Sequence, residues 1–192
     1  MSDSHEADAA AMARLRSGED LALNEIMARW QQPLANYLTR FCGSEATALD
    51  LAQETFVRVY EARARYDTRG RFATWLYTIA GNLARNFHRW QQRHPAVSLD
   101  APTDENGGTL ATRLPDSALP PDARADQAER AAAVRAAIAE LPEDLRTALL
   151  LSEFEDRSHA DIAATLACTP KAVETRLYRA RQTLREKLTR WL

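Results

Sequence analysis

The chain has few cysteines, no long apolar run and no stretch in which polar and apolar residues alternate. Its two cysteines, Cys42 and Cys168, form no CxxC or Cys/His pair, so we expect reduced thiols rather than a disulfide or a zinc site. No apolar stretch approaches the length of a membrane span, and the acidic, polar N-terminus does not resemble a signal peptide. These absences predict an all-α protein that works in the cytoplasm.

The sequence also lacks the patterns of common catalytic sites. It has no Gly-rich phosphate loop, no Ser/His/Asp order and no metal-ligand spacing. The four histidines are scattered along the chain: His5, His88, His94 and His159. We therefore expect no enzymatic activity, no metal, no cofactor and no small-molecule substrate.

Acidic and basic residues lie in different parts of the chain, although the net charge is only −2. Residues 126–161 hold nine acidic residues against four arginines, and the following stretch reverses that sign. Between 162 and 192, two acidic residues, Glu174 and Glu186, face seven basic ones: Lys171, Arg176, Arg179, Arg181, Arg185, Lys187 and Arg190. Local patches rather than net charge must therefore carry any binding to phosphate.

The last thirty-odd residues predict two short helices with a sharp corner between them. Ser158, with Asp161 three residues on, is typical of a helix start at which side chains serve the free backbone N–H groups. Thr169 and Pro170 begin the next helix as N-cap and first helical residue. This second helix has an apolar stripe and an outer face rich in cations, which favours a DNA-reading helix-turn-helix over a solvated amphipathic helix.

The rest of the chain reads as two helical domains joined by a tether. Residues 8–94 are almost entirely helical in pattern, and Pro33 is expected to kink or restart a helix. Residues 95–124 are rich in Pro, Gly, Asp and Thr without an apolar period, which predicts a flexible acidic linker before a second domain at 125–192. The expected helices before the C-terminal pair are 9–16, 21–30, a segment reaching 41, 45–63, 71–93, 123–140 and 143–154. Gly43-Ser44 is expected to end the segment that reaches 41 and to cap the helix that follows.

The expected helix 45–63 has an apolar and a polar stripe. The polar stripe, with Asp50, Gln53 and Glu54, is either a solvent-facing side of a core helix or a docking face for a basic partner. The apolar stripe is expected to contain Leu49, Ala52, Phe56 and Val59.

The second half of the expected helix 71–93 contains Asn and Arg residues and no acid. Such side chains hydrogen-bond base edges and phosphates, so this segment is a candidate nucleic-acid face. Trp75 falls on the apolar stripe, which favours the core over base contact. Trp90 is open to either interpretation, because it also suits packing at the helix end.

Two long segments carry a resemblance to a known family. They are LAQETFVRVYEARARYDTRGRFATWLYTIAGNLARNF and LPEDLRTALLLSEFEDRSHADIAATLACTPKAVETRLYRARQTLREKL. They resemble the bacterial RNA polymerase sigma factors of the sigma-70 family, in the small extracytoplasmic-function (ECF) group. The resemblance implies a sigma-2 domain at 8–94 and a sigma-4 domain at 125–192, which bind core RNA polymerase and direct promoter recognition and transcription initiation.

The resemblance also implies residue roles and partners. Asp50, Gln53 and Glu54 would dock on the clamp helices of the polymerase β′ subunit, and the first helices of the second domain on the β flap. The residues expected to read and open the −10 element of promoter DNA are Asn82, Arg85, Asn86, His88 and Arg89. Those expected at the −35 element are Lys171, Glu174, Thr175, Arg176, Tyr178 and Arg179. An anti-sigma factor is a further expected partner.

Two features leave the expected promoter sequence open. Glu174 stands where the family commonly has a basic residue. Its carboxylate has two alternative roles: it accepts a hydrogen bond from a cytosine amino group, or it orients a nearby arginine. Asp156-Arg157 replaces the usual Gly-containing turn.

The alternative function is a stand-alone helix-turn-helix regulator, which would share the C-terminal motif but leave the Asp50–Glu54 face and the basic helix unexplained.

Overall fold

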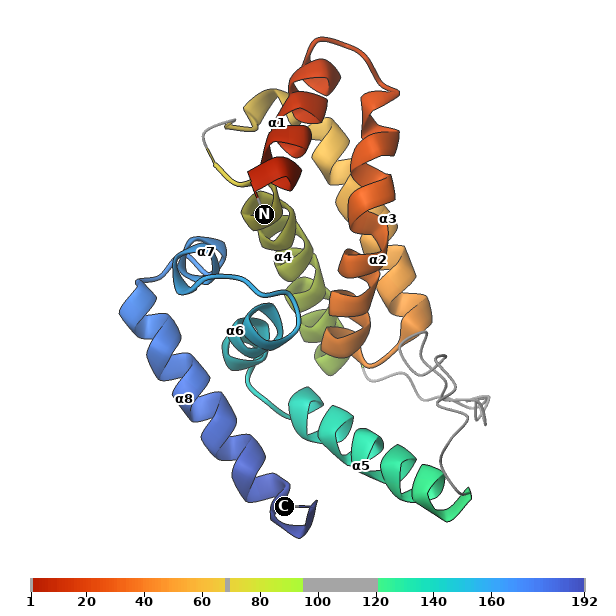
Figure 1. The fold of residues 1–192 in the computed structure, drawn as a ribbon, viewed down its shortest axis with the longest axis vertical. Helices are drawn as coiled ribbons and strands as arrows, with labels where there is room; N and C mark the ends of the chain where they lie inside the picture. The colour runs from red at the N-terminus through yellow and green to blue at the C-terminus, as the bar shows by residue number, and fades with distance from the viewer. Residues whose placement is uncertain (1, 68–69, 95–120, 192) are drawn as a thin grey trace.

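The computed structural model describes residues 2–67, 70–94 and 121–191. Within these ranges every regular element is a helix, which confirms the all-α fold (Figure 1). The elements are α1 (Ser2–Arg16), α2 (Ala22–Cys42), α3 (Glu45–Glu61), the 3-10 turn η1 (Arg63–Arg65), α4 (Phe72–Arg93), α5 (Pro121–Ala139), α6 (Glu143–Glu153), α7 (His159–Thr165), α8 (Pro170–Lys187) and the 3-10 turn η3 (Thr189–Trp191).

Helices α1–α4 form an N-terminal bundle in which α2 packs against α1, α3 and α4. Helix α2 ends at Cys42 with Gly43 as its C-cap, whose φ of 74° is left-handed and whose N–H donates to the carbonyl of Thr39. Ser44 then caps α3 by accepting from the N–H of Thr47 at 3.3 Å. The stop and start expected at Gly43 and Ser44 are thus confirmed.

Of the kink or restart expected at Pro33, the restart does not occur, because α2 runs through the proline as one helix. Proline cannot donate to the carbonyl of Arg29, so one helical hydrogen bond is missing there. Burial of the helix's apolar stripe outweighs that loss. The stripe continues at steps of four on both sides of the proline: Ile26, Trp30, Leu34 and Leu38.

Helix α1 begins at Ser2, earlier than the sequence pattern predicts. Buried Asp8 joins α1 to α2, because its Oδ1 accepts from the Nε of Arg29 at 2.8 Å and from the indole N–H of Trp30 at 3.1 Å.

No helix of the described ranges is long and apolar enough to cross a membrane.

Most of the expected linker, residues 95–120, lies outside the described residues. The remainder belongs to α5, which begins at Pro121 rather than near residue 123. A proline in the first turn of a helix costs no hydrogen bond, because the N–H groups there have no intrahelical partner. The C-terminal helical group therefore starts slightly earlier than expected.

The C-terminal corner has the predicted caps. Ser158 accepts from the N–H of Asp161 at 3.1 Å, and Thr169 accepts from the N–H of Ala172 at 3.2 Å. Helix α7 ends at Thr165 with Leu166 as its C-cap, and the next residue, Ala167, has a φ of 50°. The N–H of Ala167 donates to Ala164 and that of Cys168 to Ala163, which is the hydrogen-bond pattern of a Schellman turn. Glycine usually occupies the position that Ala167 holds.

The two helical groups share one hydrophobic core. In the N-terminal bundle the ring of Tyr77 in α4 lies 5.2 Å from that of Tyr37 and 6.2 Å from that of Trp30, both in α2. This cluster is continuous with buried Leu149 and Leu150 of α6. Helices α6 and α7 lie against α2 and α4, as Figure 1 shows.

Candidate nucleic-acid and partner interface

Helix α3 presents the expected polar face to solvent. Asp50, Gln53 and Glu54 are all exposed, and the Oε1 of Glu54 accepts from the Nε of Arg58 at 2.7 Å. We call these three residues the docking face. Two exposed apolar side chains flank it, Leu49 at 44% and Val57 at 50% exposure.

The placement of Leu49 corrects one expectation. Leu49 does not belong to the buried stripe of α3, whose members are Ala48, Ala52, Thr55, Phe56 and Val59. The buried stripe is centred on Ala52 and Phe56, and it includes Ala48 one turn before Ala52, so the neighbouring Leu49 points outward. The docking face therefore has apolar as well as polar contacts to offer.

The second half of α4 carries two repeated asparagine–arginine pairs. The Nη2 of Arg85 donates to the Oδ1 of Asn82 at 2.6 Å, and the Nη2 of Arg89 donates to the Oδ1 of Asn86 at 2.5 Å. Asn82, Asn86 and Arg89 are exposed, and Arg85 is half-buried. The pairs leave the amide NH₂ groups free, so this face presents hydrogen-bond donors and two cations to a nucleic acid.

The docking face and the asparagine–arginine face adjoin each other. Glu54 and Arg58 of α3 and Asn82 of α4 line one open groove, together with Arg65 and Ile79. A partner bound on α3 would therefore border directly on a strand bound along α4.

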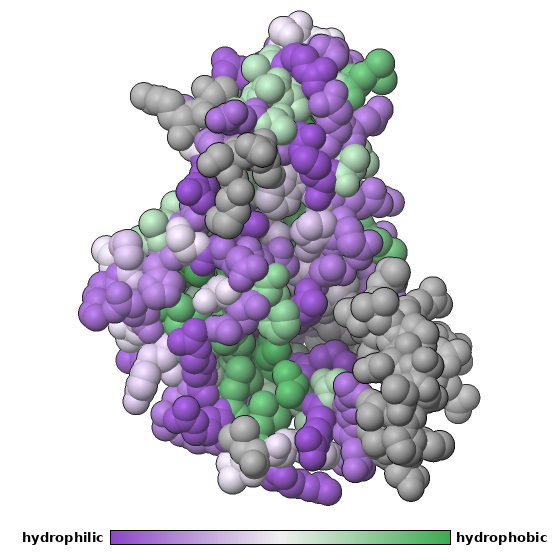
Figure 2. All heavy atoms as spheres, viewed as in Figure 1, coloured by the Kyte–Doolittle hydropathy of each residue, from purple (hydrophilic) through white to green (hydrophobic). Residues whose placement is uncertain are grey.

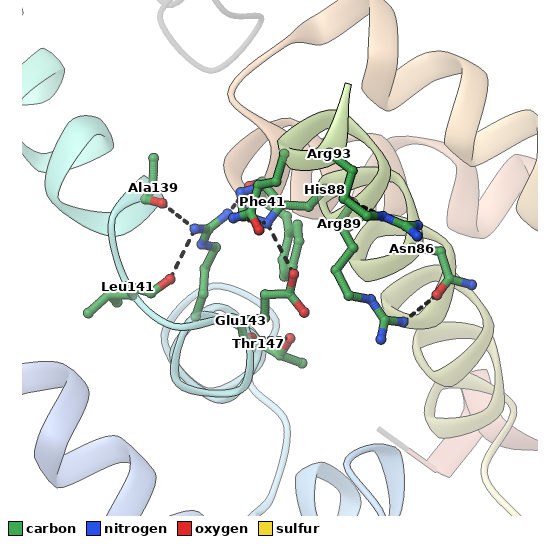
Figure 3. A network of polar contacts seen from close by, with 11 residues as sticks. Phe41, Asn86, His88, Arg89, Arg93, Ala139, Leu141, Glu143 and Thr147 are labelled. Atoms are coloured by element: carbon green, nitrogen blue, oxygen red, sulfur yellow. Dashed lines mark hydrogen bonds and ion pairs between the residues drawn. The ribbon is translucent and has the colours of Figure 1, made fainter. Parts of the chain in front are cut away.

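His88 lies differently from the other four candidates of α4. Its ring Nδ1 is 3.0 Å from the Oε1 of Glu143, the first residue of α6, and its side chain is 26% exposed. Figure 3 shows this contact, with Asn86 and Arg89 on another side of α4. The structure thus groups Asn82, Arg85, Asn86 and Arg89, and places His88 against the C-terminal domain.

The aromatic residues of α4 also separate into two kinds. The ring of Trp75 lies 5.1 Å from that of Tyr66 and 6.0 Å from that of Phe72, so Trp75 packs against the core and stays partly exposed. Trp90 is 52% exposed and stacks on His94 with 5.1 Å between ring centroids. An exposed, flat ring at this helix end is available to stack on a base.

Helix α8 carries most of the residues expected at the −35 element on its outer side. Lys171, Glu174, Thr175, Tyr178 and Arg179 are exposed, and Tyr178 is 69% exposed. Pro170 at the first helical position and Thr169 at the N-cap fix where this helix begins.

Arg176 does not share that outer face. Its Nε donates to the Oδ2 of Asp144 in α6 at 2.9 Å, its side chain is 25% exposed, and its Nη1 is buried. This geometry lets Arg176 fix α8 against α6, and turns it away from a groove that the other five residues would enter.

Many of the cations that the sequence shows near α8 are paired with acids. Arg181 donates to Glu153 at 2.6 Å, Lys171 to Glu174 at 2.6 Å, and Lys187 to Glu140. Arg179 and Arg185 make no ion pair within the described part of the chain. The positive field of α8 is therefore weaker than its count of seven basic residues suggests.

Glu174 is held by Lys171 one turn before it. Its hydrogen bond to the Lys171 ammonium lowers the pKa of the Glu174 carboxyl below its usual value, so this group is a carboxylate at neutral pH. Glu174 also lines a shallow groove with His159, Tyr178 and Gln182. Glu174 is therefore a hydrogen-bond acceptor, and its neighbours in this groove carry hydrogen-bond donors.

The sequence did not single out two buried charged residues, Arg146 and Glu155. Both lie where α6 and the loop after it meet the N-terminal bundle. The signal available in the sequence was weak, because an arginine and a glutamate in a mixed helix and loop are usually solvated. Their burial depends on packing between the two domains.

Comparisons with known proteins agree with this geometry. Residues 26–94 match the family described as Sigma-70 region 2, and residues 131–184 match that described as Sigma-70, region 4. The ECF RNA polymerase sigma-E factor of Haemophilus influenzae is 34% identical over 182 residues, covering 94% of this chain and 95% of that protein. The RNA polymerase sigma-H factor of Pseudomonas aeruginosa is 34% identical over 188 residues, covering 95% and 94%.

Solved structures show the same architecture. CnrH in complex with the cytosolic domain of CnrY matches with a TM-score of 0.69 and 26% identity, covering 95% of this chain and 97% of that chain. The sigma factor RpoE of Bartonella quintana, in complex with the anti-sigma factor NepR, matches with a TM-score of 0.61 and 20% identity, covering 88% and 98%, and shows a likeness of fold.

The fold and the exposed faces thus define a two-domain transcription initiation factor. The chain belongs to the sigma-70 family of RNA polymerase sigma factors, in its ECF group. Its function is that of a sigma factor that directs transcription initiation, and this interpretation is favoured over the stand-alone helix-turn-helix regulator.

Proposed function

We propose that the two domains read two separate promoter elements while both are held on core RNA polymerase. The observation that supports this is the pair of exposed faces on different domains, one along α4 and one along α8. The docking face of α3 would bind the clamp helices of the β′ subunit, with Leu49 and Val57 adding apolar contact at its edges.

The α4 face would bind the −10 element. Asn82 and Asn86 have free amide donors for base edges, and Arg85 and Arg89, which hold those amides, bring positive charge for the backbone of a separated strand. Trp90 supplies a further stacking surface. His88 would join this face when it leaves Glu143.

The outer side of α8 would bind the −35 element in the major groove. Lys171, Glu174, Thr175, Tyr178 and Arg179 would contact bases and phosphates, and Arg176 would hold α8 on α6. Arg176 thus contributes to this site through position rather than through contact with DNA.

DNA binding by the free chain should be weak. Ion pairs within the C-terminal domain neutralise several cations of α8, and the net charge of the chain is −2. When polymerase holds both domains, DNA bound by one domain would be present at a high effective concentration near the other domain. Fluorescence anisotropy with a labelled promoter duplex at physiological salt tests this: binding should need core polymerase, and tight, sequence-specific binding by the chain alone would contradict the proposal.

Two protein partners are part of the proposal. The C-terminal domain would bind the β flap. Figure 2 shows an apolar area between α5 and α8, on an otherwise hydrophilic face, and this area is a suitable surface for that contact. An anti-sigma factor would be the second partner, as it is for the Bartonella protein of similar fold. The apolar groove between α2, α3 and α5, with exposed Leu49, Val134 and Phe154, favours a protein partner of this kind.

The protein would act in the cytoplasm, where polymerase and promoter DNA are, and without catalytic chemistry of its own. Pull-down of core polymerase by the tagged chain from a cytoplasmic extract, followed by the same experiment with purified polymerase, tests this. A chain that binds promoter DNA but no polymerase would favour the stand-alone regulator instead.

A further inference from the structure

An asparagine and an arginine three residues apart are hydrogen-bonded in the middle of α4. The Nη2 of Arg85 donates to the Oδ1 of Asn82 at 2.6 Å. One turn later the Nη2 of Arg89 donates to the Oδ1 of Asn86 at 2.5 Å, and Figure 3 shows this second pair. In both pairs the arginine occupies the amide oxygen and leaves the amide nitrogen free within the described part of the chain.

The chemistry of the two groups allows only one bonded orientation of the Asn82 amide. A guanidinium has five N–H donors and no acceptor, so an amide NH₂ group turned toward it would make no hydrogen bond. The bond to Arg85 therefore keeps Oδ1 toward the guanidinium and leaves the NH₂ group of this exposed residue to meet a ligand. Because the donor is charged, the bond is stronger than one between two neutral groups.

Arg85 is held in place more firmly than Arg89. Arg85 is half-buried, whereas Arg89 is exposed. A methyl group added at Gly81 would lie 3.7 Å and 3.9 Å from the two Nη atoms of Arg85, and 3.5 Å from the hydroxyl of buried Tyr37. The guanidinium of Arg85 thus lies close to the bare backbone of Gly81, on the side of α4 where Tyr37 of α2 also lies.

The missing side chain of Gly81 makes room for this arrangement. Glycine in a helix interior is less stable than alanine, because it loses more conformational freedom on folding. A long side chain at position 81 would occupy space that the Arg85 guanidinium now fills. Gly81 therefore favours the conformation in which Arg85 reaches Asn82.

An amide in a fixed orientation reads a base differently from a free amide. An asparagine with both amide groups free pairs with adenine through two hydrogen bonds, one to the N6 amino group and one to N7. With Oδ1 held by Arg85, only the NH₂ group of Asn82 remains, and the positive charge beside Oδ1 repels a further donor. The NH₂ group suits O6 and N7 of guanine or O4 of thymine, which present acceptors on the same base edge.

We propose that Arg85 is a positioning residue for Asn82, and that their bond directs the base preference at the position read by Asn82 toward guanine or thymine and away from adenine. The inference rests on the proposed function, in which α4 binds the −10 element. It gives Arg85 a role in the choice of base, in addition to the charge that it brings to the strand backbone. A phosphate contact alone would leave that choice unchanged, because phosphates carry no sequence information.

Transcription by purified core polymerase from promoters with a randomised −10 element tests the inference. The position read by Asn82 is the one at which Asn82→Ala loses the base preference, and there the wild type should select guanine or thymine. Arg85→Met removes the donor and keeps a long apolar stem. It should raise transcription from templates with adenine at that position, relative to guanine and thymine, at least about fivefold.

Two further variants separate positioning from charge. Arg85→Lys keeps a donor that can reach Oδ1, so it should restore the wild-type base preference. Arg93→Met is the matched control, because it removes another arginine of α4, whose Nε donates to the backbone carbonyl of Arg89 and not to an asparagine. The control should lower transcription from all templates alike and leave the base preference unchanged.

Gly81 offers a second test that leaves Arg85 and Asn82 in place. Gly81→Ala adds a methyl group at an ordinary van der Waals distance from Arg85 and should keep the wild-type base preference. Gly81→Leu should displace the guanidinium and shift the preference toward adenine, as Arg85→Met does. Helix content by circular dichroism should be the same in all of these variants.

The outcomes separate this inference from the proposed function. A wild type that selects adenine at the Asn82 position overturns the inference, and so does an Arg85→Met variant that lowers transcription without changing the base preference. In both cases the reading of the −10 element by α4 would stand. A wild type that selects no −10 sequence with core polymerase, or an Asn82→Ala variant that keeps every base preference, overturns the assignment of Asn82 to the −10 element, and the inference with it.

Discussion

The hydroxyl of Tyr77 donates to the Glu155 carboxylate at 2.5 Å, and this bond joins the N-terminal bundle to the loop between α6 and α7. Burial raises the pKa of Glu155 above its ordinary value, although Tyr77, Arg40 and Arg157 act in the opposite direction. The folded chain therefore binds a proton at Glu155 more readily than the unfolded chain does, in which this carboxyl is in water.

The first prediction is that Glu155 stabilises the folded chain more in mild acid than at neutral pH. The pKa of Glu155 is raised in the folded chain, so its contribution to the free energy of unfolding is fully present below its ordinary pKa of 4.5 and is lost as pH rises through the raised value. Urea unfolding should therefore show a larger fall in the free energy of unfolding between pH 5 and pH 7.5 for the wild type than for Glu155→Gln, which cannot titrate. An identical change in both proteins would contradict the prediction.

The second prediction separates the two reading faces. In a transcription-based selection on a randomised promoter library, Asn86→Ala should alter the preferred −10 sequence and leave the −35 preference intact. Thr175→Ala should do the reverse, since it lies on α8. Unchanged preferences in both variants would contradict the assignment of these faces.

The third prediction concerns the carboxylate of Glu174. A carboxylate accepts from the amino group of cytosine, whereas an amide pairs with adenine through two hydrogen bonds. Glu174→Gln should therefore replace cytosine by adenine at one position of the selected −35 element. An unaltered selection would mean that Glu174 acts only on its neighbour Lys171.

The fourth prediction concerns the docking face. Asp50→Lys should weaken binding to core polymerase by about tenfold, because it reverses charge at the centre of a polar contact. Glu19→Lys makes the same change on the exposed turn before α2 and should bind as the wild type does. Equal affinities of the two variants, measured by titration with labelled polymerase, would remove Asp50 from the interface.

The fifth prediction concerns the corner of the helix-turn-helix. Ala167 has a left-handed φ of 50°, which costs an alanine more than a glycine. Ala167→Gly should therefore stabilise the chain by about 0.5–1 kcal/mol in thermal unfolding. Ala164→Gly, three residues earlier within α7, should destabilise it by a similar amount. Destabilisation by both substitutions would contradict the account of this turn.

Local chemistry predicted much of the fold. The caps at Ser44, Ser158 and Thr169 accept from the N–H groups expected of them, because capping depends on residues three apart in the sequence. Pro33 was misjudged for the opposite reason. A local rule allowed a new helix to start at this proline, and the burial of a long apolar stripe in α2 overrides that tendency.

The candidate faces were predictable where their residues lie on one helix. Spacing along α3 and α4 places Asp50, Gln53 and Glu54 together, and likewise Asn82 and Asn86. Spacing could not show that His88 meets Glu143 or that Arg176 meets Asp144, because these contacts join residues far apart in the chain. The buried contacts of Arg146 and Glu155 with the N-terminal bundle could not be predicted for the same reason.

Run-off transcription with purified core polymerase on a randomised promoter library tests the central claim most directly. The account predicts that this chain directs initiation from templates with two conserved elements, one near −10 and one near −35, and that core polymerase alone selects neither. Selection of one element only, or no transcript above that of core polymerase, would contradict it.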